Sequence, residues 1–328
     1  MAVDSQDHGH NHTHGAIDPV LLTTRRGIWA IKWSCIGLLA TAGLQVGAVL
    51  LTGSVALLAD TVHNFGDATT VVPLWIAFAL ARRPPTRRFS YGYGRVEDFA
   101  GLVILLTILG SGLLAGYEST LRLFRPQTVA SLWAVFAASG IGFLGNEAVA
   151  RLRLRVGHEI GSAALTADGY HARADALTSL SVLLGAVGVW LGYPRADPLV
   201  GLLITVVIFK IAWDSGKSVF ARLLDRIDPS VIDEVRHAAN HIPEVRDVTE
   251  VRARWVGHRL WAEVNIAVDS HMTVEQAHRI ASEVRHQLLH HLRYLSNAIV
   301  HVDPLNASGE QHHRIHGHAH DAWPTHSH

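Results

Sequence analysis

Long apolar runs fill most of the chain up to about residue 220, and alternating polar patterns replace them after that. An apolar run of about 20 residues is long enough to cross ~30 Å of hydrocarbon as a helix. The pattern predicts six membrane-spanning helices, at Trp29–Leu51, Val55–Leu80, Phe99–Tyr117, Val129–Ala150, Leu165–Leu191 and Ala196–Trp213. We therefore expect an integral, multi-pass membrane protein whose α-helical membrane domain occupies residues 27–220.

After Asp225 the charged residues become frequent, which predicts a soluble domain at residues 225–306. Periodicity and turn signals predict, in order, a helix at Val231–Ile242, strands at Asp247–Arg254 and Arg259–Val268, a helix at Thr273–Leu292 and a strand at Ala298–Val302. This α-β-β-α-β order fits a small α+β, ferredoxin-like domain with its helices on one face of the sheet. A domain of about 80 residues is marginal for an independent core, so we expect a second copy to pack against it in a homodimer.

Two of the apolar segments, at residues 57–68 and 165–176, carry the same polar pattern, Asp-x-x-His-x-x-x-Asp. Its members are Asp60, His63 and Asp67 in the first segment and Asp168, His171 and Asp175 in the second. Residues three, four and seven apart lie on one face of a helix, so each triplet forms one polar stripe. A carboxylate in the middle of a membrane helix costs roughly 2.5–3.5 kcal/mol, so these groups require a compensating partner.

Four of these side chains suit a bound metal ion. His63, Asp67, His171 and Asp175 supply two imidazole nitrogens and two carboxylate oxygens, a tetrahedral set that suits Zn²⁺. Calcium and magnesium prefer more oxygen ligands. The alternative is that the polar groups pair with one another or with backbone carbonyls and simply hold the helices together.

The remaining two carboxylates, Asp60 and Asp168, would exceed four ligands. We interpret them as groups that orient the metal ligands through hydrogen bonds or relay protons. The alternative is that they only take part in helix packing.

Charge and cysteine content exclude other classes of protein. The 28 Lys and Arg residues balance 28 Asp and Glu residues, so no general basic surface indicates a nucleic-acid partner. The single cysteine, Cys35, excludes a disulfide framework or a thiolate metal site within one chain.

Both ends of the chain are rich in histidine. Of 23 histidines, four lie between His8 and His14 and seven between His312 and His328. We expect residues 1–26 to be a disordered tail that collects metal, and residues 307–328 to be a second His-rich tail. The first tail lacks the apolar core of a signal peptide. A solvated tail without a required role, or an affinity tag, is the alternative interpretation.

Basic loops predict the orientation. Five arginines lie in the predicted loop at Ala81–Arg95, and Arg151, Arg153 and Arg155 mark a second basic loop. Cytoplasmic loops carry the excess of Lys and Arg, so both loops are expected on the cytoplasmic side. Six spans then place both termini in the cytoplasm, and we expect the cell (inner) membrane as the location.

With six predicted spans, the doubled polar pattern, Tyr-Gly-Tyr-Gly-Arg at residues 91–95 and an α-β-β-α-β domain, the chain resembles the cation diffusion facilitator family over Gly27–Pro304. The resemblance implies a homodimeric secondary transporter, not an enzyme, that exports divalent metal from the cytoplasm in exchange for protons. His63, Asp67, His171 and Asp175 match the family's transport-site positions. Two His with two Asp is similar to the zinc-type members, so Zn²⁺ is the expected substrate, with Cd²⁺ or Co²⁺ tolerated.

The resemblance also concerns a possible cytoplasmic metal site. His278, His301 and Asp303 match ligands that the family uses there, and His301 and Asp303, two apart on a strand, point to one side. Thr249 and Asn265 stand where some relatives have histidine, which implies a reduced or missing binuclear site for regulatory Zn²⁺.

Two further positions bear on other metal sites. Tyr93 stands where some members have a metal-binding loop histidine, which argues against a metal site in that loop. We expect most other histidines of the soluble domain, including His258, to be surface or packing residues.

Two other functions fit parts of the pattern. A membrane-embedded zinc hydrolase needs an open coordination position and a general base, which Asp60 or Asp168 could supply, but the chain has neither a His-Glu-x-x-His nor a Gly-x-Ser-x-Gly motif. A metal sensor would use the spans only as an anchor, which paired carboxylates in two separate spans argue against.

Overall fold

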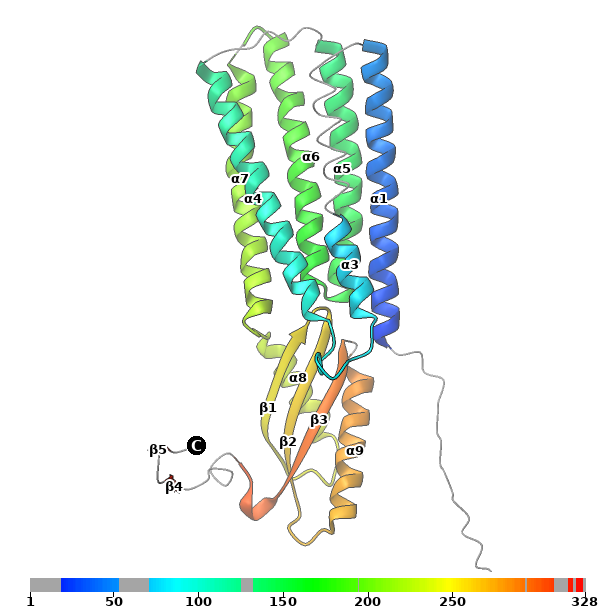
Figure 1. Cartoon of the computed structure of the whole chain (residues 1–328), viewed down its shortest axis with the longest axis vertical. Helices are drawn as coiled ribbons and strands as arrows, with labels where there is room; N and C mark the ends of the chain where they lie inside the picture. The colour runs from blue at the N-terminus through cyan, green and yellow to red at the C-terminus, as the bar shows by residue number, and fades with distance from the viewer. Residues whose placement is uncertain are drawn as a thin grey trace, which may run out of the picture.

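The computed structural model describes residues 19–52, 71–124, 132–193, 195–292, 294–309, 318–320 and 323–326. Figure 1 shows a bundle of long helices that run side by side, with a small domain containing a three-stranded sheet at one end of the bundle. The short connection between β1 and β2 lies at the junction of the two parts.

The bundle contains the apolar helices predicted from the sequence. They are α1 (Pro19–Thr52), α3 (Val71–Ala81), α4 (Arg95–Phe124), α5 (Leu132–Ile160), α6 (Ala163–Trp190) and α7 (Ala196–Leu223). Within the described ranges, five of these helices are long and apolar enough to cross a membrane, and α3 is a shorter apolar helix. Of the predicted second span, residues 53–70 lie outside the described residues, and α3 covers its last part.

Several helices extend beyond the apolar runs that predicted them. Because α1 begins at Pro19, the predicted tail of residues 1–26 is too long. The predicted basic loop at residues 151–155 is also wrong, because α5 continues to Ile160. Hydropathy detects only the part of a helix that lies in hydrocarbon. The helix itself can continue into the aqueous boundary, because its backbone hydrogen bonds do not depend on apolar side chains and long charged side chains reach water there.

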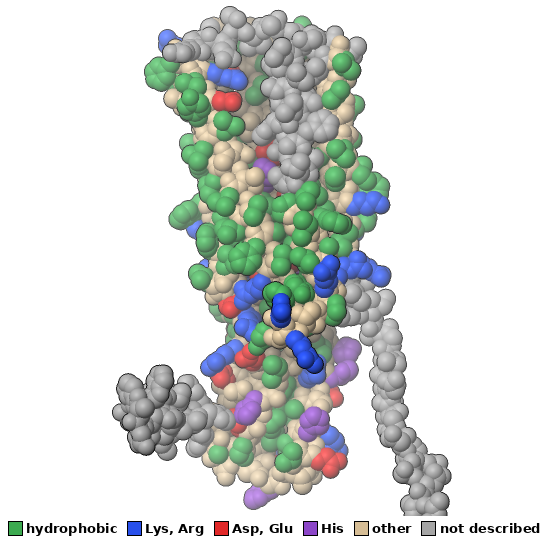
Figure 2. Space-filling model, in the orientation of Figure 1, with side chains coloured by type: hydrophobic (Ala, Val, Ile, Leu, Met, Phe, Trp, Pro, Cys, Tyr) green, Lys and Arg blue, Asp and Glu red, His purple; other side chains and the backbone are tan. Residues whose placement is uncertain are grey.

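The surface of the bundle is apolar. Figure 2 shows hydrophobic side chains spread over the bundle and Lys and Arg side chains gathered where the bundle meets the domain. Large apolar residues on three different helices are strongly exposed, among them Phe99 at 61%, Trp133 at 83% and Val206 at 67%. Such a continuous exposed apolar surface on helices of this length indicates contact with lipid.

Helices α5 and α6 approach each other closely through glycines. A Cβ atom on Gly157 of α5 would lie 2.8 Å from the backbone nitrogen of Thr166 in α6. Likewise, a Cβ on Gly169 of α6 would lie 2.9 Å from the backbone nitrogen of Leu154 in α5. Small residues at such crossings let helix backbones pack tightly in membranes, and here they fix the position of α6 against α5.

The second part of the chain has the predicted α-β-β-α-β order. Its elements are α8 (Pro229–Asn240), β1 (Asp247–Val256), β2 (Arg259–Val268), α9 (Val274–His291) and β3 (Leu295–Pro304). The strands lie in the order β1-β2-β3, with β1 and β2 antiparallel and β2 and β3 parallel. Helix α9 makes the crossover that a parallel pair requires. A helical membrane domain followed by a small α+β domain is thus confirmed.

Both helices of this domain begin at a side-chain N-terminal cap. The Asp228 carboxylate accepts a hydrogen bond from the backbone N–H of Ser230 at 3.0 Å and caps α8. Hydrogen bonds from Ser230 lower the pKa of the exposed Asp228 carboxyl. Thr273 and Gln276 form a reciprocal capping box at the start of α9.

The core of the domain lies between its helices and one face of the sheet. Val235 of α8 and Val284 and Leu288 of α9 are fully buried against Val264 and Ile266 of β2. The amphipathic helices supply their apolar faces to this layer, as the sequence predicted.

The C-terminal region holds three short elements. These are a 3₁₀ turn, η1 (Leu305–Ala307), and two short antiparallel strands, β4 (His318–His320) and β5 (Trp323–His326). The two strands lie within the region predicted as a His-rich tail, for which the sequence predicted no regular structure.

Candidate metal site

The second polar stripe lies on α6 and faces the interior of the bundle. Asp168, His171 and Asp175 are exposed by 0%, 1% and 4%. The distance between His171 Nδ1 and Asp175 Oδ2 is 3.7 Å. One imidazole and one carboxylate therefore lie side by side, away from the lipid-facing surface.

The N-terminal end of α6 is held by a side-chain cap. Ser162 Oγ accepts a hydrogen bond from the backbone N–H of Leu165 at 3.1 Å and caps the helix. The helix that follows is rich in buried alanine and glycine, which allows the close contact with α5 described above. The cap and the tight packing thus fix the position of α6 along its axis and its rotation about that axis, and so the direction in which the His171 side chain points.

A buried arginine stands opposite the first carboxylate of the stripe. Arg153 Nη1 of α5 lies 3.1 Å from Asp168 Oδ2, and the two side chains are 1% and 0% exposed. This ion pair balances the charge of Asp168 inside the bundle, which favours a supporting role for Asp168 over direct metal ligation.

The run of arginines at residues 151–155 is typical of a solvated loop, and it conceals the burial of Arg153. The one local signal in the sequence is helical spacing: Val149 and Gly157 lie one turn to either side of Arg153, and both are buried in the structure.

The first polar stripe, Asp60, His63 and Asp67, lies outside the described residues. In the part of the chain that the structure describes, no group of three or more His, Cys, Asp or Glu side chains is arranged to hold a metal ion. The described part of the candidate site is therefore the pair of His171 and Asp175 on α6. A tetrahedral site would need two further ligands from a neighbouring helix.

In the small α+β domain the structure brings together two of the three ligands predicted there. His301 Nε2 lies 2.9 Å from Asp303 Oδ1, with His301 half-exposed and Asp303 buried. Among the described residues, His278, exposed on α9, does not join them in a three-residue metal cluster.

The side chains of Thr249 and Asn265 form hydrogen bonds between β1 and β2. The Thr249 hydroxyl donates to the Asn265 carbonyl at 3.3 Å, and the Asn265 amide donates to Glu250 Oε2 at 3.2 Å.

The Tyr-Gly-Tyr-Gly loop contacts its surroundings through aromatic rings. The ring of Tyr93 lies 4.8 Å from that of Phe89, and the ring of Tyr91 lies 5.4 Å from that of Trp261 in β2. The loop between α3 and α4 therefore packs against the three-stranded sheet.

Comparison with known proteins covers both parts of the chain. Residues 31–224 match the family described as the cation efflux transmembrane domain, and residues 227–305 match the cation efflux protein cytoplasmic domain. A probable cation efflux system protein of Mycobacterium tuberculosis is 50% identical over 89% of this chain and 89% of its own length.

More distant relatives have names that point to different roles. The manganese efflux system protein MneP of Bacillus subtilis is 24% identical over 83% of this chain and 95% of its own length. The magnetosome protein MamB of a Magnetospira species is 26% identical over 78% of this chain and 88% of its own length.

Proposed function

This chain belongs to the cation diffusion facilitator family of cation efflux transporters, and from that premise we propose that it exports Zn²⁺ from the cytoplasm in exchange for protons. It is a multi-pass membrane protein and a transporter, not an enzyme, so the hydrolase alternative falls away. The metal, the coupling to protons and the residues involved are parts of the proposal.

The observation that carries the proposal is the buried His171–Asp175 pair on α6. We propose that His63 and Asp67 complete a tetrahedral transport site with this pair. A charged group and an imidazole inside a membrane bundle are costly unless they serve an ion pathway. The Arg153–Asp168 pair supports this division of roles, because it balances the charge of Asp168 separately from the two proposed ligands on α6.

Proton coupling follows from the chemistry of the ligands. A divalent cation binds neutral imidazole and ionised carboxylate, so metal binding displaces protons, and protonation of the same groups expels the metal. If the helices open alternately to the two sides around this site, protons entering from outside drive metal out of the cytoplasm.

The choice of zinc rests on the ligand types. Imidazole suits Zn²⁺, whereas carboxylate, carbonyl and water suit Mn²⁺. A site with two imidazoles and two carboxylates is therefore expected to prefer Zn²⁺, and also to accept Cd²⁺ or Co²⁺ better than Mn²⁺. The name of the Bacillus relative makes Mn²⁺ the competitor that must be tested.

We further propose that the protein works as a homodimer joined through its cytoplasmic domains, in the inner membrane, with both termini in the cytoplasm. The match to a cytoplasmic domain and the basic residues near the bundle–domain junction support this arrangement. The His301–Asp303 pair is proposed as the described part of a cytoplasmic metal site, to which His278 would contribute.

The test is metal uptake into proteoliposomes that contain the purified full-length chain. We expect Asp175→Asn and His171→Ala to reduce Zn²⁺ transport by more than about 100-fold, since groups that only support metal ligands are already worth about 10- to 100-fold. Asp214→Asn on α7 and His286→Ala on α9 alter exposed residues of the same types and should transport at wild-type rates.

The same vesicles test substrate and coupling. Uptake should be faster for Zn²⁺ than for Mn²⁺, and it should increase when the side that receives the metal is made more acidic. Wild-type rates in Asp175→Asn would overturn the assignment of the site. Faster Mn²⁺ than Zn²⁺ uptake would overturn the metal, and indifference to the pH gradient would overturn proton exchange.

A further inference from the structure

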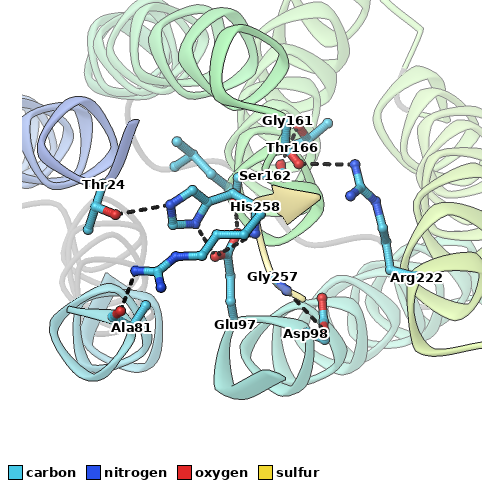
Figure 3. A network of polar contacts seen from close by, with 12 residues as sticks. Thr24, Ala81, Glu97, Asp98, Gly161, Ser162, Thr166, Arg222, Gly257 and His258 are labelled. Atoms are coloured by element: carbon cyan, nitrogen blue, oxygen red, sulfur yellow. Dashed lines mark hydrogen bonds and ion pairs between the residues drawn. The ribbon is translucent and has the colours of Figure 1, made fainter. Parts of the chain in front are cut away.

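A buried polar network joins the turn between β1 and β2 to the adjacent ends of the membrane helices (Figure 3). At its centre is His258, which is 2% exposed. Its Nδ1 lies 2.7 Å from Glu97 Oε2 of α4, and its Nε2 lies 3.0 Å from Thr24 Oγ1 of α1. Glu97 and Thr24 are each 1% exposed. One side chain of the cytoplasmic domain thus bridges two membrane helices away from water.

The second oxygen of Glu97 extends this network to α6. The Ser162 hydroxyl donates to Glu97 Oε1 at 2.5 Å, and Ser162 Oγ accepts from the backbone N–H of Leu165 at 3.1 Å. Ser162 is the N-terminal cap of α6, the helix that carries His171 and Asp175. A continuous series of hydrogen bonds therefore runs from the cytoplasmic domain to the start of the helix that bears the candidate site.

We propose that His258 and Glu97 are positioning residues for transport, through which the cytoplasmic domain sets the position of the N-terminal end of α6. This inference rests on the proposed transport site on α6. His258 acts through Glu97 and Ser162, and it touches neither the metal nor its ligands. The cytoplasmic domain thus influences transport through a defined side-chain link as well as through its covalent connection to α7.

The backbone around His258 fits the bundle closely, which makes the link stiff. The backbone N–H of His258 donates to Glu97 Oε2 at 3.2 Å, and that of Gly257 donates to Asp98 Oδ2 at 3.4 Å. Gly257 has a φ of +64°, and a Cβ there would lie 2.7 Å from the carbonyl oxygen of Gly94. The turn therefore requires glycine both for its left-handed conformation and for its close approach to the start of α4.

Other contacts also hold the domain against the bundle, but they do not involve the side chain of Ser162, the N-terminal cap of α6. The guanidinium of Arg222 in α7 lies 3.9 Å from the ring centroid of Trp255 and donates to the Gly161 carbonyl at 3.0 Å. The Tyr294 hydroxyl donates to the Glu159 carbonyl at 3.2 Å. These contacts keep the domain docked, so loss of the His258 side chain should loosen the link to α6 without releasing the domain.

Two conservative substitutions separate the two halves of the His258 contact. An asparagine amide can occupy roughly the place of Nδ1, so His258→Asn retains a donor to Glu97 and loses the contact with Thr24. A glutamine amide reaches roughly to the place of Nε2, so His258→Gln retains the contact with Thr24 and loses the side-chain contact with Glu97, while the backbone N–H of residue 258 still reaches Glu97. His286→Gln, which alters an exposed histidine of α9, is the matched control.

The first measurement is amide hydrogen exchange of the full-length protein in metal-free nanodiscs. His258→Gln should increase exchange at Leu165 at least fivefold, whereas His258→Asn and His286→Gln should stay within twofold of wild type. In proteoliposomes, His258→Gln should lower kcat for Zn²⁺ at least threefold with KM unchanged. Equal exchange at Leu165 in His258→Gln and wild type would overturn the proposal, as would a KM increase without a change in kcat.

A second variant approaches the link from its other end. Ser162→Ala, inside the bundle, should increase exchange of the His258 amide in the cytoplasmic domain at least threefold, because a coupling between two sites is reciprocal. If that amide does not respond, the link does not exist, even if His258→Gln proves too unstable to purify. The exchange measurements need no metal transport, so a failure of the proposed zinc export would appear separately, as inactive wild-type vesicles.

Discussion

At the scale of single residues, the buried Arg153–Asp168 ion pair leads to a prediction about the free energy of unfolding. Arg153→Met leaves the carboxylate of Asp168 inside the bundle without its guanidinium, and breaking a buried ion pair on one side costs about 3–5 kcal/mol. Denaturant unfolding in detergent, without metal, should show a loss of this size. Arg151→Met is the matched control, because Arg151 is 75% exposed, and its pair with Glu147 is worth at most ~1 kcal/mol.

A double variant separates the loss of the ion pair from the loss of packing by the large arginine side chain. Arg153→Met combined with Asp168→Asn should recover much of the lost free energy of unfolding, since no unbalanced charge remains. If Arg153→Met is as stable as Arg151→Met, the two charges do not depend on each other.

Single residues also show how far sequence alone could define the site. His171 and Asp175 were predicted because an ionisable residue within a long apolar run is costly in a membrane unless it serves an ion or a polar partner. Arg153 and His258 were not recognised, because a charged residue near the end of an apolar run, or a histidine beside a glycine turn, usually indicates a solvated loop. Their burial depends on partners distant in sequence, Asp168 in one case and Glu97 in the other. No local pattern reports such a partner.

At the scale of helices and strands, the apolar runs predicted the type and order of the elements but not their ends. Most elements of the cytoplasmic domain lie within two residues of their predicted bounds, because turn and capping residues such as Asp228 and Gly257 mark their limits, whereas β3 (Leu295–Pro304) extends beyond the predicted Ala298–Val302. Gly161, with a φ of +68°, marks the end of α5 in the same way, but the arginine run before it hides the continuation of the helix. Helix α5 continues to Ile160 because its last turns carry arginines that remain compatible with a helix outside hydrocarbon.

The contact between α5 and α6 gives a prediction at this scale. Gly169→Val places a branched side chain 2.9 Å from the backbone nitrogen of Leu154, so the two helices must separate or rotate. Overpacking of this kind costs about 1–3 kcal/mol, and the rotation would displace His171. We expect a lower Tm and reduced Zn²⁺ uptake in the same variant.

Gly140→Val on α5 is the matched control, since a Cβ at Gly140 would meet no atom of the described residues within 4 Å. It adds the same side chain to a membrane helix without creating a clash. If Gly169→Val and Gly140→Val have equal Tm values and equal uptake, the glycine does not set the spacing of α5 and α6.

At the scale of the whole molecule, the bundle and the cytoplasmic domain form a connected structure. The turn at Gly257 and His258 lies against α1 and α4, and the loop between α3 and α4 packs on β2 through Tyr91. A movement of the domain must therefore act on several membrane helices. The sequence predicted the two parts and their order, but it did not predict this junction, which consists entirely of contacts between the two parts.

The distribution of charge along the long axis predicts the orientation of the molecule in the membrane. Arg82, Arg83, Arg87 and Arg88 are exposed in the loop beside the cytoplasmic domain. At the opposite end, the described part of the turn between α6 and α7 exposes Tyr193 and one arginine, Arg195. Because positive loops stay on the cytoplasmic side, the domain, and with it both termini, should face the cytoplasm.

Labelling with a membrane-impermeant maleimide tests this orientation in intact bacterial cells that express the full-length chain. In a Cys35→Ser background, which removes the single native cysteine, Tyr193→Cys should be labelled from outside. Ser230→Cys, on α8, should be labelled only after the membrane is made permeable. Both substitutions lie at positions that the structure shows to be exposed, so a difference in labelling reflects the side of the membrane and not burial in the protein. Labelling of Ser230→Cys in intact cells would place the cytoplasmic-type domain outside. The proposed placement of the domain and both termini in the cytoplasm would then be wrong.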